Sequence, residues 1–139
     1  MTHTYLRKVN YYETDKMGLA HHANYIKWME ESRVAFLEQI GLPYDQFEEM
    51  GFVSPVVGLS VDYKTGCTFA DTVAIQVWIE RYTGVRLEVG YRMTNSRTGK
   101  LVATATSQHC FLQDGKVVSL KKLGTPAHEI LERAVQPEE

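Results

Sequence analysis

The sequence predicts an α+β fold in which an antiparallel sheet of five to six strands wraps around one long central helix. Three observations lead to this prediction. One helical pattern lies near the front of the chain, at residues 23–40. Segments in which apolar and polar residues alternate, as in half-buried strands, follow it. The turns between these segments are short, and short turns join antiparallel strands, whereas parallel strands need long crossovers.

The helix is expected over residues 23–40, with Gly41 as its end and Pro43 just beyond. On a helical wheel its strongly polar residues occupy a sector of only about 100°, which is narrower than the polar face of a typical surface helix. Other elements should therefore cover most of the helix. A small sheet covers one side only, so we expect a second copy of the chain to complete the cover.

Five strands are expected, one before the helix and four after it. They cover residues 5–11, 53–64, 73–80, 87–94 and 102–112. Because Pro55 lacks an N–H, it indicates a sheet edge or a strand start at its position. Asp114-Gly115 is typical of a tight hairpin. The short turns predict that the last four strands follow one another as a meander.

Length and composition indicate the class of protein. The chain has 139 residues, of which 44% are hydrophobic and 23% charged, so one globular domain over residues 1–139 is expected. A net charge of -2 gives no overall basic field for nucleic acid. No stretch approaches the roughly 20 apolar residues of a membrane span, and the polar N-terminus is unlike a signal peptide. Cys67 and Cys110 fit neither a disulfide scaffold nor a zinc site, so a cytoplasmic protein with reduced thiols is expected.

Reactive side chains are densest at residues 11–25, where the chain enters the helix. This stretch contains Asp15, the adjacent His21 and His22, and Asn24. The first N–H groups of a helix have no partner within the helix and lie at its positive end, so they can bind an oxyanion or a polarised carbonyl. The alternative is structural: the histidines and Asn24 cap the helix, and Asp15 stabilises its positive end. On the residues alone, both interpretations stay open.

The pattern Asp15-x-x-Gly18-x-x-x-His22-x-Asn24-Tyr25, followed by Trp28 and Glu30, resembles the 4-hydroxybenzoyl-CoA thioesterase family of hotdog-fold acyl-CoA thioesterases. The resemblance extends over most of the chain. It implies a hotdog fold, hydrolysis of acyl-CoA, and homodimers that pair into homotetramers with active sites at the dimer interface. It implies no metal and no cofactor, because CoA is part of the substrate.

The resemblance also implies roles for individual residues. Asp15 would act as a nucleophile that forms a mixed anhydride, or as a general base on water. The backbone N–H of His22 would polarise the thioester carbonyl, and its ring could add a hydrogen bond. Asn24 and Tyr25 would shape the substrate pocket and hold the loop. Gly58 would let backbone approach the thioester, from the partner subunit.

The sequence indicates the residues that would bind the CoA phosphates less clearly than it indicates the catalytic residues. Some members of the family use a basic run before the fourth strand. Here only Arg81 and Arg86 lie near that place, so they are the candidate CoA-binding residues. Lys64, Lys121 and Lys122 are the other candidates.

Other functions remain as alternatives. A hotdog-fold dehydratase would use His22 and Asp15 to move protons on the acyl chain, and a non-catalytic acyl-CoA-binding protein would need no carboxylate. A metal hydrolase is disfavoured, because neighbouring His21 and His22 would point in divergent directions. A serine hydrolase is disfavoured, because Gly-x-Ser-x-Gly is absent. Short, medium and aromatic acyl groups all stay open.

Overall fold

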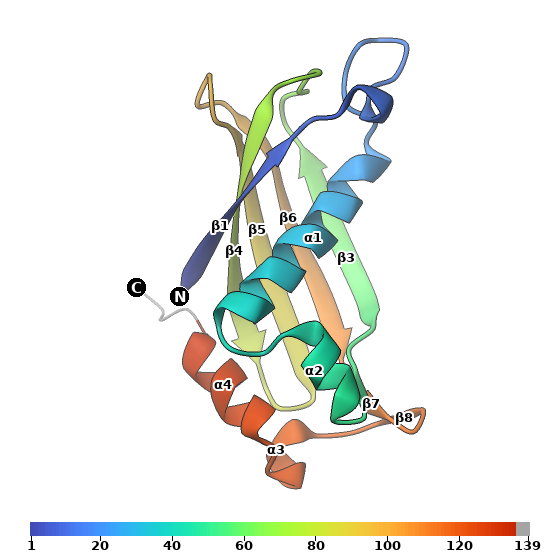
Figure 1. Cartoon of the computed structure of the whole chain (residues 1–139), viewed down its shortest axis with the longest axis vertical. Coiled ribbons are helices and arrows are strands. Elements are labelled where there is room, and N and C mark those ends of the chain that lie inside the picture. The colour runs from blue at the N-terminus through green and yellow to red at the C-terminus, as the bar shows by residue number, and fades with distance from the viewer. Residues whose placement is uncertain (136–139) are drawn as a thin grey trace.

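The structure is a computed structural model that describes residues 1–135 (Figure 1). The prediction of one domain over residues 1–139 stays a prediction, and residues 136–139 lie outside the described part. The strands are β1 (Thr2–Lys8), β2 (Phe52–Val53), β3 (Val56–Tyr63), β4 (Thr72–Tyr82), β5 (Arg86–Asn95), β6 (Leu101–Cys110), β7 (Leu112–Gln113) and β8 (Lys116–Val117). The helices are the 3-10 turn η1 (Tyr11–Glu13), α1 (Ala23–Gln39), α2 (Tyr44–Glu49), α3 (Leu120–Leu123) and α4 (Pro126–Ala134).

The main sheet is antiparallel and has the strand order β1-β4-β5-β6-β3, with α1 lying across one face (Figure 1). The predicted α+β class and strand number are confirmed. The predicted meander of four strands is wrong for its first member, since β3 pairs with β6 and not with β4. Residues 64–71 lead from the edge strand β3 past β6 and β5 to β4. This segment is long enough to join strands that are not neighbours.

Two element boundaries also differ from the prediction. The first strand ends at Lys8, because residues 11–13 form a 3-10 turn that is closed by a capping box between Asn10 and Glu13. The segment 53–64 is broken ahead of β3, and Val53 pairs with Leu112 in a small second sheet. Pro55 directly precedes β3, which lies at the sheet edge as predicted.

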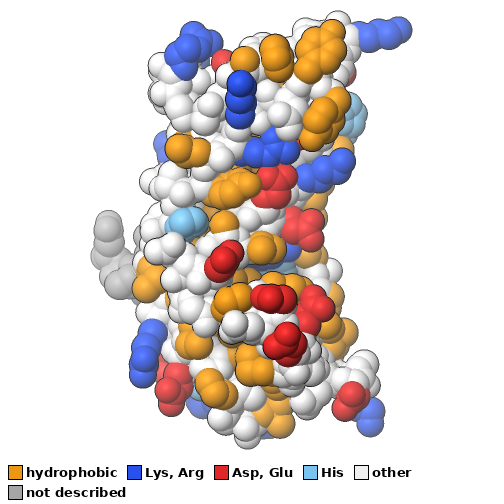
Figure 2. All heavy atoms as spheres, viewed as in Figure 1, with side chains coloured by type: hydrophobic (Ala, Val, Ile, Leu, Met, Phe, Trp, Pro, Cys, Tyr) orange, Lys and Arg blue, Asp and Glu red, His pale blue; other side chains and the backbone are white. Residues whose placement is uncertain are grey.

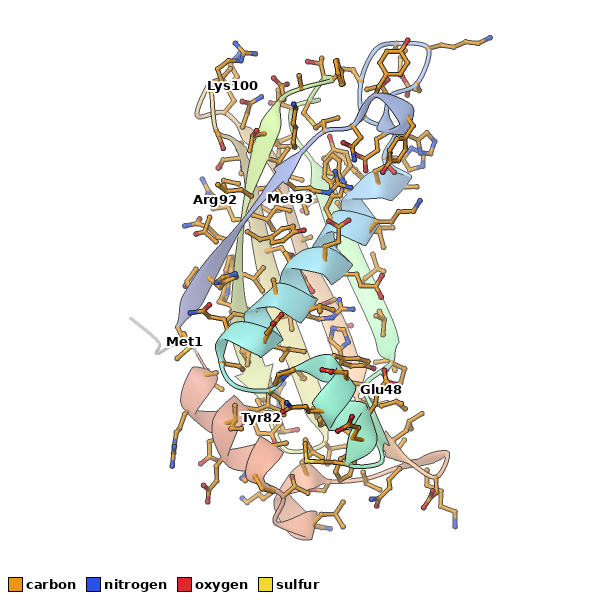
Figure 3. All side chains as sticks on the ribbon, viewed as in Figure 1. Met1, Glu48, Tyr82, Arg92, Met93 and Lys100 are labelled. Atoms are coloured by element: carbon orange, nitrogen blue, oxygen red, sulfur yellow. The ribbon has the colours of Figure 1, made fainter. Side chains whose placement is uncertain are left out.

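The core lies between the sheet and α1. Trp28, Met29 and Phe36 point from α1 onto the sheet and are almost fully buried. Strand residues alternate across the sheet, so Met93 is buried beneath the helix while its neighbour Arg92 is exposed on the other face (Figure 3). This packing fixes the direction of α1, and with it the position of the loop before the helix.

The side of α1 that faces away from the sheet is uncovered in the single chain. Val34 is 39% exposed there, and Ile26, which is 41% exposed, lies on the neighbouring flank, where it lines a pocket with Val56 and Leu59 of β3. The edge strand β3 is apolar as well: its exposed hydrophobic residues are Val56, Val57, Leu59 and Tyr63. Figure 2 looks onto this face, where acidic side chains gather over α1 and α2. The exposed acidic residues of these helices are Glu30, Glu38, Asp45, Glu48 and Glu49.

Candidate active site

Asp15 lies in a tight loop between η1 and α1. Its N–H donates to the Leu19 carbonyl over 2.9 Å, and the Gly18 N–H donates to the Asp15 carbonyl over 2.9 Å. Gly18 has a φ of +76°, a left-handed conformation that favours glycine. The Met17 N–H donates to Oδ1 of Asp15 over 2.9 Å, which orients the carboxylate. Among the described residues, Oδ2 of Asp15 accepts no hydrogen bond, so this oxygen is available to a ligand.

A pocket of about 230 Å³ separates this loop from the end of β3. It contains three of the predicted site residues, namely Asp15, His22 and Tyr25. Its other lining residues are Met17, Leu19, Ala20, Tyr63, Lys64, Thr65 and Gly66. Asp15 is half-buried, so one side of its carboxylate faces the pocket. The structure therefore brings together the carboxylate and the helix start on which the sequence prediction depends.

The N–H groups at the N-terminus of α1 differ in whether they have a partner within residues 1–135. The Ala23 N–H donates to Nδ1 of His21 over 3.2 Å, so His21 has the capping role of the structural interpretation. No group within residues 1–135 accepts a hydrogen bond from the His22 N–H. The Tyr63 hydroxyl donates to the His22 carbonyl over 2.9 Å and ties β3 to the helix start. The His22 N–H thus remains available at the positive end of α1.

Asn24 does not line the pocket. Its Nδ2 donates to the Glu13 carbonyl over 2.8 Å, a contact that holds the loop against α1. Tyr25 is 3% exposed, and its ring packs on Trp28 and Tyr63 with centroid distances of 4.9 and 5.0 Å. Its hydroxyl lies 3.4 Å from Sγ of Cys67.

Burial disfavours ionisation beneath the pocket. It raises the pKa of Tyr25, where the nearby Cys67 adds to the effect, and it also raises the pKa of the Cys67 thiol. Cys67 is fully buried. The thiolate is the nucleophilic form of cysteine, so this environment leaves Cys67 as a packing residue.

Gly58, Arg81 and Arg86 lie away from the Asp15 pocket of their own chain. A Cβ at Gly58 would meet Oε1 of Gln108, so glycine here allows the Gln108 side chain to pack over β3. Arg81 and Arg86 line a separate pocket of about 320 Å³ where β4 meets β5. Figure 3 labels the neighbouring Tyr82 at the end of the molecule opposite to the Asp15 loop. The roles predicted for these three residues stay predictions.

Tyr63 is a pocket residue that the sequence did not single out. It contacts a helix start that lies 41 residues earlier in the chain. The alternating pattern placed Tyr63 only within the predicted strand 53–64, and no local signal indicates this contact. Lys64, by contrast, was a candidate for phosphate binding, and the structure places it at the Asp15 pocket.

Comparison with known proteins identifies the family. The profile of the Thioesterase-like superfamily matches residues 9–131, and the chain belongs to this family. The predicted resemblance to hotdog-fold thioesterases is thereby confirmed.

Individual relatives cover most of the chain. YneP of Bacillus subtilis (strain 168), provisionally named an acyl-CoA thioesterase, is 36% identical over 129 residues, which are 91% of this chain and 93% of that protein. A protein of Aquifex aeolicus (strain VF5), provisionally named an esterase, is 31% identical over 122 residues, which are 88% of this chain and 94% of that one. The crystal structure of the DHNA-CoA thioesterase from Staphylococcus aureus superimposes with a TM-score of 0.89 at 28% identity, over 95% of this chain and 89% of that one.

Within residues 1–135, no helix is both long and apolar enough to cross a membrane.

Proposed function

We propose that the protein hydrolyses acyl-CoA thioesters to a carboxylic acid and free CoA. The observation that carries the proposal is the pocket itself. The Asp15 carboxylate and the His22 N–H, which has no partner within residues 1–135, both lie there at the positive end of α1. The names of YneP and of the Staphylococcus aureus thioesterase support the same class of substrate.

The geometry supports separate roles for the His22 N–H and for Asp15. The thioester carbonyl oxygen would accept a hydrogen bond from the His22 N–H, which stabilises the oxyanion that forms at that oxygen. Asp15 would attack the carbonyl carbon, or take a proton from a water that attacks it. In both routes water supplies the hydroxyl of the acid, the C–S bond breaks, and the CoA sulfur leaves as the thiol. The choice between the two routes stays open.

We further propose that the working unit contains two chains joined along β3. Within residues 1–135 this strand pairs with β6 on one side only, so among these residues its other side presents unpaired N–H and C=O groups beside exposed Val57 and Leu59. Antiparallel pairing with a second β3 would cover these groups and the exposed Ile26 side of α1. It would also turn the partner end over end, and so carry the partner's Gly58 toward this chain's Asp15.

The same arrangement suggests where the CoA phosphates bind. Arg81 and Arg86 lie at the end of the folded molecule that is opposite to the Asp15 loop. In an antiparallel pair they would therefore approach the partner's pocket. Lys64 already lines the pocket within each chain. A homodimer, pairing further into a homotetramer, is the assembly we propose.

A hydrolysis screen tests the proposed function. Acyl-CoA substrates with short, medium and aromatic acyl groups are incubated with the protein, and free thiol is measured. The proposal predicts catalytic release of CoA from at least one class. Binding without thiol release across the whole panel would favour a non-catalytic acyl-CoA-binding protein instead.

A further inference from the structure

Glu13 is a buried carboxylate two residues before Asp15. It is 3% exposed, and each of its oxygens accepts two hydrogen bonds. Oε1 accepts from Asn10 N–H over 2.8 Å and from the Arg7 guanidinium over 2.9 Å. Oε2 accepts from Trp28 Nε1 over 2.9 Å and from Arg7 over 3.0 Å. Burial raises the pKa of Glu13, but these donors outweigh it and leave the pKa below its ordinary value.

Arg7 joins Glu13 to the long helix. Its Nε donates to Oε1 of Glu31 over 2.8 Å, and its Nη1 also donates to the Lys8 carbonyl over 2.6 Å. The guanidinium carbon lies 5.8 Å from the centre of the Trp28 ring. The forked guanidinium binds the Glu13 carboxylate through two parallel hydrogen bonds, a geometry that a lysine cannot provide. The side chains therefore connect β1, η1 and α1 at one point.

The main chain of Glu13 holds the other end of the Asp15 loop. Its carbonyl accepts from the His21 N–H over 2.8 Å and from Nδ2 of Asn24 over 2.8 Å. One residue is thus fixed to β1 and α1 by its side chain, and to the residues flanking His22 by its carbonyl. Asp15 and His22 both lie within the short segment that these contacts enclose.

We propose that Glu13 and Arg7 are positioning residues that hold Asp15 at its working distance from the N-terminus of α1. Neither residue lines the Asp15 pocket, so we assign neither of them a contact with the thioester. The inference rests on the proposed function, because it assigns a purpose to the position of Asp15. A displacement of about 1 Å can cost on the order of 10²-fold in rate, so a loosened loop should affect turnover more than substrate binding.

The test compares Glu13→Gln with Glu31→Gln. Glutamine at position 13 places an amide NH₂ against donors and leaves Arg7 without its buried counter-charge. We expect kcat to fall about 10- to 100-fold while KM changes less than about threefold. Glu31→Gln is the matched control, because Glu31 shares Arg7 but makes no hydrogen bond to the Asp15 loop within residues 1–135. Its kcat should stay within about twofold of the wild type.

The double variant Glu13→Gln/Asp15→Asn separates positioning from a general loss of structure. Without the Asp15 carboxylate there is nothing to position, so Glu13→Gln should not lower the residual rate further. If Glu13→Gln fails to fold, Arg7→Lys keeps the charge and loses the fork, and should lower kcat at least about threefold.

Two results would overturn the inference: full kcat in folded Glu13→Gln, or equal losses in the wild-type and Asp15→Asn backgrounds. Wild-type turnover in Asp15→Asn would overturn the proposed catalytic role of Asp15, and the inference with it. A fall in Asp15→Asn alone would leave the catalytic role standing and remove only the positioning role.

Discussion

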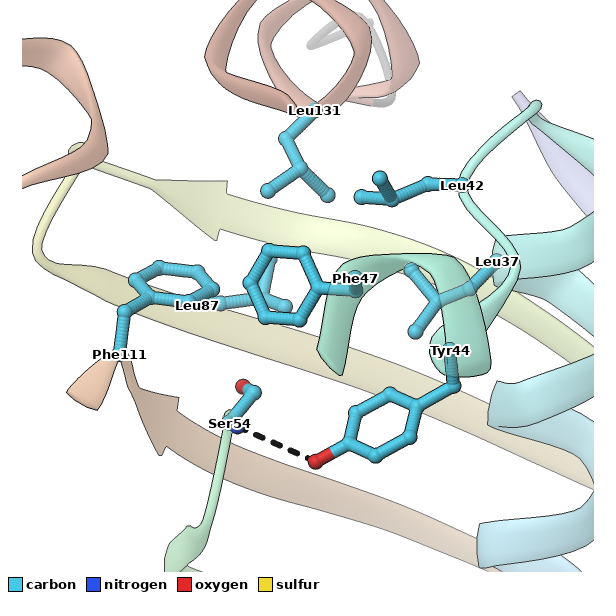
Figure 4. A pocket seen from close by; sticks show the side chains of 8 residues that line it. All are labelled: Leu37, Leu42, Tyr44, Phe47, Ser54, Leu87, Phe111 and Leu131. Carbon is cyan, nitrogen blue, oxygen red and sulfur yellow. Dashed lines mark hydrogen bonds between the residues drawn. The ribbon is translucent and has the colours of Figure 1, made fainter. Parts of the chain in front are cut away.

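The two ends of α1 lie beside pockets of opposite character. At the N-terminal end, the Asp15 pocket contains a carboxylate, a histidine and a lysine. At the C-terminal end, a cavity of about 20 Å³, room for about one water, lies beneath α2 and α4 (Figure 4). Its lining residues are Leu37, Leu42, Tyr44, Phe47, Ser54, Leu87, Phe111 and Leu131. The polar contact drawn there joins the Ser54 N–H to the Tyr44 hydroxyl over 3.2 Å.

This difference indicates that the apolar end of α1 contributes mainly to stability and the polar end mainly to the chemistry of the site. At the apolar end, side chains are packed and the Tyr44 hydroxyl has a partner. At the polar end, the His22 N–H and one oxygen of Asp15 have no partner within residues 1–135. Unpartnered polar groups contribute nothing to folding and cost free energy when they are buried. We therefore expect substitutions at the two ends to affect different quantities.

The largest effect is expected at Asp15. Asp15→Asn keeps the shape of the side chain and an oxygen that can accept from the Met17 N–H, but it removes the charge. We expect kcat to fall at least about 10²-fold, the lower range for loss of a positioned acid–base or nucleophilic group, with an unchanged melting temperature. Asp114→Asn, at the exposed β7–β8 hairpin, is the control and should leave both quantities unchanged. Near-normal turnover in Asp15→Asn would end this assignment.

At the apolar end, Leu131→Ala should lower the free energy of unfolding and leave kcat per folded molecule unchanged. Leu131 is 1% exposed and lines the cavity of Figure 4. Its truncation should cost about 2–5 kcal/mol, which urea unfolding measures. Leu123→Ala, at a residue 48% exposed, should cost less than about 1 kcal/mol. Loss of turnover in folded Leu131→Ala would show that the two ends are not independent.

The buried His109 gives the interior a defined dependence on pH. His109 is 1% exposed, and its Nε2 lies 2.8 Å from Oγ of Ser107. Burial, together with the charge of Arg33, lowers the pKa of His109 to about 4. An unfolded chain takes up this proton near pH 6.5, whereas the folded chain resists it until about pH 4. The contribution of His109 to stability is therefore full above pH 6.5 and is lost as the pH falls toward 4.

The expected loss from His109 is about 2–3 kcal/mol between pH 7.5 and pH 4.5. Urea unfolding of the wild type and of His109→Gln at both pH values measures it. The variant lacks the titrating ring, so its stability should fall less across this range. Equal pH dependence in the two proteins would contradict the proposed cause, since Glu13 and the other carboxylates are common to both.

The smallest effect is expected at the His22 ring. In the proposed mechanism the main contribution of His22 comes from its backbone N–H, which a substitution retains. His22→Ala should therefore reduce kcat less than Asp15→Asn does, by about 3- to 10-fold. A larger loss in His22→Ala than in Asp15→Asn would make the ring the main catalyst and favour the dehydratase alternative.

The sequence predicted the elements of the fold better than their arrangement. The helix and the alternating strands follow from local periodicity, so their positions agree with the structure to within a few residues. The pairing of β3 with β6 could not be predicted in this way. Turn length restricts the partner of a strand only when the turn is short, and residues 64–71 are long enough to cross the sheet.

The site, too, contains residues that could be predicted from the sequence and residues that could not. Asp15, His22 and Tyr25 are close in sequence, and one loop followed by one helix turn brings them together. Tyr63 and Lys64 reach the same pocket only because β3 is the edge strand beside the helix start. Arg7 and Glu13 are six residues apart, but their contact requires the chain to fold back at η1, which the alternating pattern does not indicate.

The amide signal of His22 in the NMR spectrum tests directly whether its N–H binds the thioester carbonyl. An acyl-CoA analogue in which a methylene group replaces the thioester sulfur keeps the carbonyl but cannot be hydrolysed. When this analogue binds, we expect a downfield shift of the His22 amide proton, because this N–H gains a carbonyl acceptor, and no comparable change at Leu131. Binding of the analogue with an unchanged His22 amide would show that this N–H does not bind the thioester carbonyl.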